Sequence, residues 1–181
     1  MIRFAILGML SHRPQTGYDL KKVFVESEAL YWSGNNNQIY RTLSELLEEG
    51  LVTKEIHAQE KLPAKGIYAI TDKGLAELKR WLVSPPEAPE YRSTFLVRLM
   101  WADQLESPEL ETLLLQYEQE VHAQLLMQRE KARRAEQQPG GTPRQAYLRE
   151  MISENITGCY ERELAWVGKV RRGLNGRENH E

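Results

Sequence analysis

The clearest periodic pattern in the chain lies between Trp32 and Val52. Four apolar residues recur there at steps of four, three and one: Ile39, Leu43, Leu46 and Leu47. This spacing predicts an amphipathic helix with one apolar face. Asn35 or Asn36 is a suitable N-cap, because a short side-chain amide can accept hydrogen bonds from the free N–H groups of the first turn. Gly50 is a favourable residue for the turn that ends the helix.

The opposite face of this helix is polar through its first turns. It carries Asn37, Gln38, Tyr40, Arg41, Thr42 and Glu45. The residues alone allow two interpretations of this face. It can be solvated surface, as on most amphipathic helices, or part of a recognition helix whose N-terminal half enters the DNA major groove. The second is chemically reasonable, because Asn and Gln can bond adenine, Arg can bond guanine, and Tyr can reach a phosphate.

Helices are also predicted on both sides of this stretch. Residues 2–10 are apolar on nearly every side, which predicts a short buried helix. Residues 16–27 predict a second helix with one inward apolar face. Behind the central helix, Thr71 or Asp72 is a suitable cap for a further helix that ends near Leu82.

Two strands are predicted between these helices. Residues 51–59 and 67–71 have the alternation and the β-branched residues typical of strands, and residues 61–66 predict the turn between them. The turn carries Lys61 and Lys65, so the hairpin is either a cationic wing or an ordinary hairpin with solvated lysines. Three helices, two strands and a helix in this order predict a winged helix-turn-helix.

A proline-rich segment, residues 84–90, divides the chain. We therefore expect residues 1–83 to form a DNA-binding domain and residues 91–174 to form a helical dimerisation domain. Residues 175–181 have no periodic pattern, and we expect a disordered tail. The expected fold is mainly α with a small two-stranded β-wing.

Two long amphipathic helices dominate the C-terminal half. One begins at Ser107–Pro108 and extends to about Gln137, and the other follows the break at residues 139–143 and carries apolar residues to Leu174. An isolated pair of this kind leaves apolar faces exposed, so it needs a second copy or a monomeric bundle to cover them. We favour a two-fold dimer, because it also places two recognition helices on a palindromic site.

The charge of the chain gives little support to DNA binding. The 181 residues carry a formal net charge of −2. The first 83 residues contain eleven basic and ten acidic side chains, so the net charge of the expected DNA-binding domain is only +1. Phosphate contacts supply most non-specific affinity. Binding would therefore depend on a few well-placed cations in each subunit.

The composition also bears on the cellular location. The single cysteine, Cys159, excludes an internal disulfide and fits a reducing compartment. No run of about 18 apolar residues is present, so we expect no membrane span. The apolar start of the chain continues without a small-residue cleavage site, and we interpret it as a core helix rather than a signal peptide. We expect a cytoplasmic protein.

An enzyme and an interaction module are the alternative classes. The four histidines, His12, His57, His122 and His180, have unrelated spacings, and no nucleophile, metal or phosphate-binding motif is present. We expect no catalytic residue, no metal site and no cofactor. Cys159 falls on the inward stripe of the last helix, where we expect a buried, inert thiol. The near-neutral first domain is the one feature that favours an interaction module without specific DNA binding.

Six segments of the sequence carry a family resemblance. They are ILGML, TGYDLKK, WSGNNNQIYRTLSELLEEGLV, YAITDKGLAELKRWL, PPEAPEYRSTFLVRLMWA and ERELAWV. With these motifs the chain resembles the PadR family of transcriptional regulators from residue 2 to about residue 174. Its long C-terminal region is similar to that of the subgroup whose prototypes are the phenolic-acid decarboxylase repressor and the virulence activator alpha.

The resemblance implies a homodimer that binds a palindromic operator in double-stranded DNA, and we expect it to act as a repressor. The positions that match the family's recognition helix, and would face the groove and its backbone, are Asn36, Asn37, Gln38, Tyr40 and Arg41. Lys61 and Lys65 would lie in the wing. The chain departs from the family pattern at Arg41, where proline commonly follows the tyrosine, and its wing is poor in arginine.

Some relatives sense small phenolic acids or drugs in an apolar cavity, so the resemblance also implies a small aromatic effector. The aromatic candidates are Trp81, Phe95, Trp101 and Trp166. Their rings could stack on a flat ligand. The alternative for each of them is core packing or a dimer contact, which is the commoner role of such residues.

Overall fold

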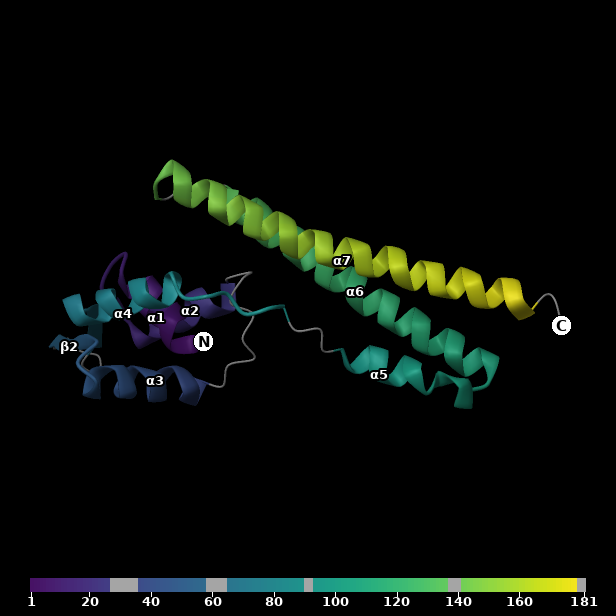
Figure 1. Ribbon diagram of the computed structural model, residues 1–181, viewed down its shortest axis with the longest axis horizontal. Coiled ribbons are helices and arrows are strands. Elements are labelled where there is room, and N and C mark those ends of the chain that lie inside the picture. The colour runs from purple at the N-terminus through teal and green to yellow at the C-terminus, as the bar shows by residue number, and fades with distance from the viewer. Residues whose placement is uncertain (27–35, 58–64, 90–92, 137–140, 179–181) are drawn as a thin grey trace. The chain divides into compact units, whose positions relative to one another are not determined.

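The computed structural model describes residues 1–26, 36–57, 65–89, 93–136 and 141–178. The chain divides into two compact units, Met1–Ala88 and Pro89–Glu181, each with its own internal packing (Figure 1). The division falls inside the proline-rich segment 84–90, where the sequence predicts a boundary.

The first unit has the element order of a winged helix-turn-helix. Its elements are α1 (Ile2–Leu10), β1 (Gln15–Thr16), α2 (Gly17–Glu26), α3 (Asn36–Glu48), β2 (Val52–His57), β3 (Lys65–Ile70) and α4 (Asp72–Leu82). The predicted fold class, mainly α with a small β-wing, is therefore confirmed.

The sheet has three strands, however, where two were expected. The additional strand is β1, which pairs antiparallel with β3 in the register Gln15↔Tyr68 and Thr16↔Ile67, so that the strand order is β1-β3-β2. A strand of two residues is too short to produce the alternation by which strands are recognised in a sequence. It forms because the second edge of β3 offers unpaired backbone groups.

The core of the first unit joins all four helices to the sheet. Its buried apolar residues are Ile2, Ile6, Leu7, Leu10, Leu20, Phe24, Ile39, Leu43, Leu46, Leu51, Val52, Tyr68 and Leu78. The short first helix supplies four of them, which confirms its predicted place inside the fold. One face of α3 is thereby fixed against α1 and α2, and its other face is left for contacts outside the unit.

The C-terminal end of α3 is fixed by hydrogen bonds around Gly50. This residue has a φ of 69°, and the amides of Gly50 and Leu51 donate to the carbonyl oxygens of Leu47 (3.0 Å) and Leu46 (2.9 Å). This pair of bonds is a Schellman motif, which favours glycine because its residue C′ is left-handed. The prediction that Gly50 ends the helix is confirmed.

The first turn of α4 binds the same end of α3. The hydroxyl of Thr71 donates to the carbonyl oxygen of Gly50 (2.9 Å) and accepts from the amide of Gly74 (3.0 Å). The ammonium group of Lys73 donates to the carbonyl oxygen of Glu49 at 2.7 Å. Helix ends leave carbonyl groups without partners inside the helix, and these two side chains satisfy two of them. We call this contact the α3–α4 junction.

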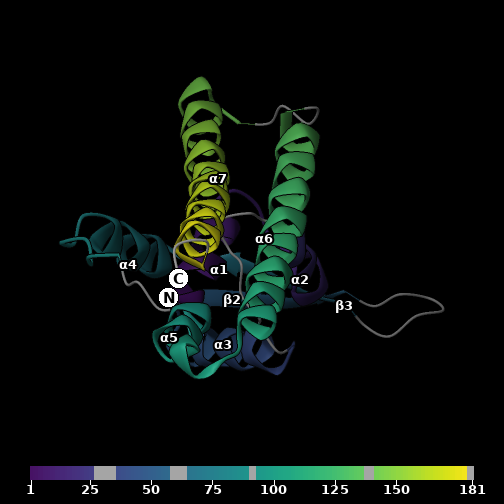
Figure 2. The same ribbon diagram turned by 90° about the vertical axis from the view of Figure 1, so that its right-hand side faces the viewer.

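The second unit is a helical hairpin with a short helix at its base. Its elements are α5 (Thr94–Met100), the 3-10 helix η1 (Ala102–Gln104), α6 (Ser107–Glu136) and α7 (Pro143–Glu178). Helices α6 and α7 run antiparallel, and α5 lies beside the first turns of α6 (Figures 1 and 2). Phe95, Leu114 and Val167 form the centre of its apolar core.

Polar contacts also join the two long helices. The guanidinium of Arg171 on α7 bonds Glu111 and Glu118 on α6, the former through Nε at 3.1 Å. Nearer the tip, Arg129 pairs with Glu161 at 2.7 Å. The pairs of Arg171 are partly shielded from solvent and help fix the register of the two helices, whereas the exposed pair of Arg129 contributes little.

Two expectations for the last helix are wrong. Helix α7 continues to Glu178, so residues 175–178 of the expected disordered tail are helical. The side chain of Cys159, expected to be buried, is exposed, and its sulfur accepts from Nη2 of Arg162 at 3.1 Å. Cys159 precedes Tyr160 of the inward stripe, and one residue is a step of about 100° around a helix. In the described segments, no helix has both the length and the apolar character needed to cross a membrane.

Two Gly→Ala substitutions, one at the α3–α4 junction and one in α1, should have opposite effects on stability. A Cβ atom at Gly74 would lie 2.1 Å from the carbonyl oxygen of Leu51, whereas a Cβ atom at Gly8 would meet no atom within 4 Å. Gly74→Ala should therefore lower the free energy of unfolding by about 2 kcal/mol. Gly8→Ala, its control inside α1, should raise it by about 0.5–1 kcal/mol. Urea unfolding followed by circular dichroism measures both changes, and equal effects would contradict the close approach at Gly74.

Candidate DNA-binding surface

Helix α3 buries one face and exposes the other, although two residues lie on the face opposite to the expected one. Thr42, predicted to be polar surface, is only 5% exposed, and Leu47, predicted to be core, is 40% exposed. Thr42 lies three residues after Ile39 and four before Leu46, so it falls inside the buried stripe. Leu47 lies at the edge of that stripe, so its side chain is only partly covered.

The other residues predicted for this face lie where the periodicity indicates. Asn37, Gln38, Tyr40 and Arg41 are all exposed in the first two turns of α3. Asn36 is the first residue of the helix, while Asn35 and Trp32 lie outside the described residues. The helix therefore presents two amides, a phenol and a guanidinium along a single N-terminal surface.

Tyr40 lies against the start of α2. A Cβ atom at Gly17, the first residue of α2, would be 2.6 Å from Cε1 of the Tyr40 ring. The preceding residue, Thr16, caps α2, because its hydroxyl accepts from the amide of Asp19 at 3.1 Å and donates to Oδ2 of that residue at 2.6 Å. Tyr40 is 48% exposed, so the phenol reaches solvent beside the N-terminus of α2.

Tyr18 is a second exposed aromatic residue at the same helix start. Its side chain is 69% exposed, and it was not predicted as a site residue from the sequence. An aromatic residue usually indicates core. The sequence places Tyr18 on a different face of α2 from the apolar Leu20 and Phe24, and this position could have indicated an exposed ring.

The wing presents lysines, but not all from the expected positions. Lys65 is exposed as the first residue of β3, paired with His57, rather than part of the turn. Lys61 lies outside the described residues. Lys54 on β2 was not predicted as a site residue, and its ammonium lies 5.5 Å from the centre of the Tyr68 ring. A lysine in a strand gives no sequence signal by itself, because solvated lysines are common there.

The electrostatics link the wing to the start of α2. The hydrogen bond from Thr16 lowers the pKa of Asp19, burial opposes that shift, and the positive charges of Lys65 and Arg13 lower the pKa further. Lys65 is therefore within electrostatic reach of α2, and part of its charge is balanced by Asp19.

Charge is unevenly distributed along α3 itself. Residues 36–44 include one charged side chain, Arg41, whereas Glu45, Glu48 and Glu49 follow at the other end. Arg3 of α1 binds Glu49 at 2.6 Å. The acidic groups that cancel the positive charge of the first 83 residues thus include three carboxylates near the end of α3, of which Glu45 pairs with Arg41 and Glu49 with Arg3. The N-terminal half of the helix, residues 36–44, carries no acidic side chain of its own.

Two of the four aromatic effector candidates lie together. Phe95 stacks on Tyr117 (ring centres 3.5 Å apart, planes at 3°) and meets Trp166 edge-on at 6.2 Å. Trp81 stacks on Phe4 in the first unit at 4.5 Å. Trp101 is 67% exposed. Tyr117, not predicted as a candidate, also donates from its hydroxyl to Glu163 at 2.7 Å.

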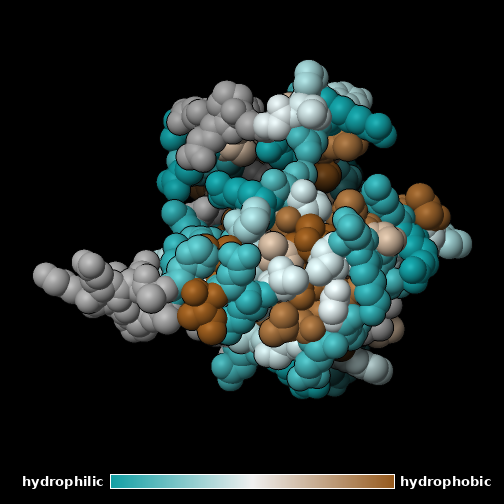
Figure 3. Space-filling view, turned by 90° about the vertical axis from the view of Figure 1, so that its left-hand side faces the viewer, coloured by the Kyte–Doolittle hydropathy of each residue, from teal (hydrophilic) through white to brown (hydrophobic). Residues whose placement is uncertain are grey.

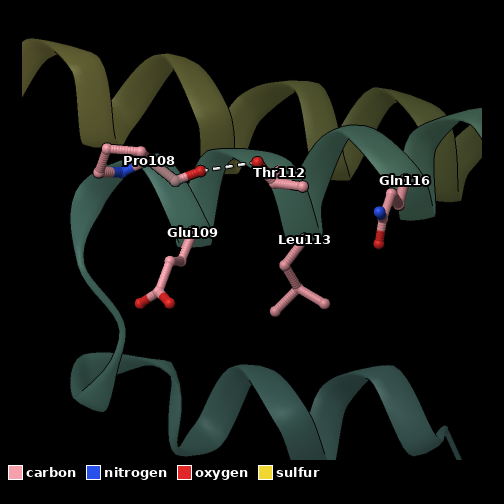
Figure 4. Close-up of a pocket in the computed structure, with 5 residues that line it drawn as sticks. All are labelled: Pro108, Glu109, Thr112, Leu113 and Gln116. Atoms are coloured by element: carbon pink, nitrogen blue, oxygen red, sulfur yellow. Dashed lines mark hydrogen bonds between the residues drawn. The ribbon is translucent and has the colours of Figure 1, made fainter.

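The second unit also has a surface depression, which these aromatic residues do not line. Its volume is about 370 Å³, and it is lined by Pro108, Glu109, Thr112, Leu113 and Gln116 along the first turns of α6 (Figure 4). It is open to solvent, and none of the four predicted aromatic residues lines it. The described residues include no group of three His, Cys, Asp or Glu side chains placed to hold a metal ion.

The face of the first unit that Figure 3 shows has hydrophobic side chains near its middle and hydrophilic ones around them. The large apolar residues that it exposes include Ile56 in the wing and Trp81, Leu82 and Val83 at the end of α4. These residues do not belong to the polar surface of α3. The candidate DNA-binding surface therefore consists of the N-terminal half of α3, the start of α2 and the wing.

A helical core with an exposed polar helix and a wing defines a winged helix-turn-helix protein, here followed by a helical hairpin. The family model of the "Transcriptional regulator PadR-like family" matches residues 6–80. The "Negative transcriptional regulator PadR" of Bacillus subtilis (strain 168) is 31% identical over 126 residues, which are 69% of this chain and 69% of that protein. The chain belongs to the PadR-like family of transcriptional regulators.

Solved structures agree with this assignment. The PadR-like transcriptional regulator BC1756 of Bacillus cereus is 26% identical, with a TM-score of 0.77 over 95% of this chain and 94% of that one. Bacillus subtilis PadR in complex with operator DNA has a TM-score of 0.79 over 93% and 96% of the two chains. Its sequence identity is 24%, so that likeness concerns the fold.

The capping contact at Asp19 predicts a pH-dependent contribution to stability. Because the native pKa of Asp19 is lowered, its contribution is complete above the ordinary aspartate pKa of about 4 and is lost as the pH falls through the native value. Asp19→Ala should lower the free energy of unfolding by about 1 kcal/mol at pH 7. The difference from the unchanged protein should shrink below about pH 4. Urea unfolding at several pH values tests this, and a difference that stays constant down to about pH 3 would contradict it.

Proposed function

We propose that the protein is a transcriptional repressor that occupies a palindromic DNA operator as a homodimer. The observation that carries this proposal is the exposed N-terminal half of α3, which presents amide, phenol and guanidinium groups on a helix whose other face is buried. A helix held in this way can enter the major groove, where base pairs display distinct patterns of donors and acceptors.

Each group on this surface has a chemical role in the proposal. Asn36, Asn37 and Gln38 would read base edges, and the guanidinium of Arg41 would bond guanine. Tyr40 would donate to a phosphate beside the N-terminus of α2, where the helix dipole also favours an anion. In the wing, Lys61 and Lys65 would approach the phosphate backbone, and we add Lys54 because it lies on the same hairpin.

The proposal of a homodimer rests on the apolar surface of the second unit. Its exposed large apolar side chains include Val97, Met100, Trp101, Leu105, Leu115, Leu126, Met127, Tyr147, Leu148 and Ile152. A monomer seldom exposes this much apolar surface, because burying it is favourable by about 25 cal/mol per Å². A second copy of the hairpin would cover it, and two-fold symmetry would present two copies of α3 to a palindrome.

Repression and release are proposed by analogy with the relative from Bacillus subtilis. That protein is a negative transcriptional regulator, and its structure in complex with p-coumaric acid is 22% identical to this chain with a TM-score of 0.79. We propose that a small aromatic effector also acts on this chain, with Phe95 and Trp166 as the first residues to test. Both already lie in one aromatic group, so a ring that enters there would compete with their packing.

Two substitutions on α3 test the recognition surface. Arg41→Ala and Tyr40→Ala should each weaken binding to the operator about tenfold or more, because each removes a contact to base or phosphate. Arg80→Ala on α4 is the control, since it removes the same charge from an exposed position that pairs with Glu77. Gel-shift titrations with the DNA upstream of the protein's own gene, at two salt concentrations, measure the affinities.

Undiminished binding by both variants would show that the recognition surface lies elsewhere. Operator binding should also weaken as the salt concentration rises, since cations on the protein displace counterions from the phosphates. If the unchanged protein bound no DNA even at low salt, the proposal would fail in favour of an interaction module.

A truncation tests the assignment of dimerisation to the second unit. The fragment that ends at Ser84 keeps the whole apolar core of the first unit but none of the exposed apolar side chains of the hairpin. We expect this fragment to be a folded monomer and the full chain to be a dimer by light scattering. A stable dimer of the fragment would contradict the assignment.

A further inference from the structure

Arg41 and Glu45 form an ion pair on the exposed face of α3. Nε of Arg41 donates to Oε1 of Glu45 at 3.0 Å. The two residues are one helical turn apart, and their side chains are 81% and 51% exposed. Among the residues that the structure describes, Glu45 bonds Arg41 through Nε rather than through either Nη atom.

The bonded atom decides which edge of the guanidinium is occupied. The planar group has a side edge that contains Nε and an end edge that contains both Nη atoms, and its five N–H donors have a fixed geometry. Glu45 binds the side edge at Nε and leaves the end edge to solvent. This end edge matches the paired acceptors N7 and O6 that guanine presents in the major groove.

An exposed arginine normally samples many rotamers, and ordering it on a base has an entropic cost. Glu45 holds the guanidinium from the adjacent turn of the same helix, so part of this ordering precedes DNA binding. Preorganisation of this kind raises affinity for the correct partner without adding a contact to it.

We propose that Glu45 is a positioning residue that fixes Arg41 for bidentate contact with one guanine in each half-site. The inference rests on the proposed function. It specifies guanine as the base that Arg41 binds and Glu45 as the residue that makes this binding selective. A carboxylate near DNA also repels phosphates and lowers non-specific affinity. This repulsion acts on operator and non-specific DNA alike, so Glu45 increases the ratio of operator affinity to non-specific affinity only through its hold on Arg41.

Glu45→Gln and its matched control Glu48→Gln test this role. Both remove one negative charge from the exposed face of the same helix, but only Glu45 is bonded to Arg41. The operator is first defined by selecting duplexes from a random library with the unchanged full-length protein. Dissociation constants are then measured on the selected operator, on a non-specific duplex, and on operators that carry 7-deazaguanine, which lacks the N7 acceptor, at one guanine at a time.

The expected result has three parts. Glu45→Gln lowers the ratio of operator affinity to non-specific affinity by about twofold, which is the most that an exposed ion pair across one helical turn can contribute, whereas Glu48→Gln leaves the ratio unchanged. For the unchanged protein, 7-deazaguanine weakens binding at one guanine in each half-site, and Glu45→Gln reduces this penalty at that guanine alone. In an Arg41→Ala background, Glu45→Gln has no further effect on the ratio, because Glu45 acts through Arg41.

Three outcomes would overturn the inference. If Glu45→Gln strengthened binding to all duplexes equally and kept the ratio, Glu45 would only compete with DNA for Arg41. If Glu48→Gln lowered the ratio as much, the effect would be one of charge on α3. If the selected operators contained no guanine that Arg41→Ala affects, Arg41 would not read guanine. Selection of no specific sequence would instead contradict the proposed function itself.

Discussion

The contact on which the DNA-binding unit depends is the α3–α4 junction, where the last carbonyl groups of α3 meet the first turn of α4. Lys73 bonds the carbonyl of Glu49, Thr71 bonds that of Gly50, and the backbone of Gly74 lies so close to Leu51 that a side chain would collide. The last carbonyl groups of a helix have no partner inside the helix. The junction satisfies them and fixes the direction in which α3 leaves the core.

Because one end of α3 is fixed, the side chains that its other end exposes are also fixed in position. The apolar stripe of Ile39, Leu43 and Leu46 settles the rotation of the helix about its axis, and the junction settles its position along that axis. At the N-terminal half, the space left by Gly17 accommodates the ring of Tyr40 against the start of α2. A reading surface needs this rigidity, because a displacement of about 1 Å is enough to break a hydrogen bond to a base edge.

The features predicted correctly from the sequence are those that local physics decides. Helix α3, its end at Gly50 and the cap at Thr71 follow from periodicity and from the chemistry of helix ends. The errors arise where a distant element decides the outcome. Strand β1 exists only because β3 pairs with it, and the burial of Thr42 depends on the helices that cover α3. The spacing of four residues could have suggested the bond between Arg41 and Glu45. It could not have shown that Nε, rather than an Nη atom, is the donor.

The near-neutral charge of the first 83 residues is compatible with DNA binding because specificity and phosphate attraction are separate quantities. Few cations mean weak non-specific affinity and a shallow dependence on salt, so discrimination must come mainly from base contacts. On such a surface, an acidic residue on the proposed recognition helix α3 lowers affinity for every sequence. Glu45 can still increase discrimination if the order that it imposes on Arg41 benefits one base pair more than the others. A weakly charged regulator therefore depends more on the preorganisation of a few side chains than a strongly basic one does.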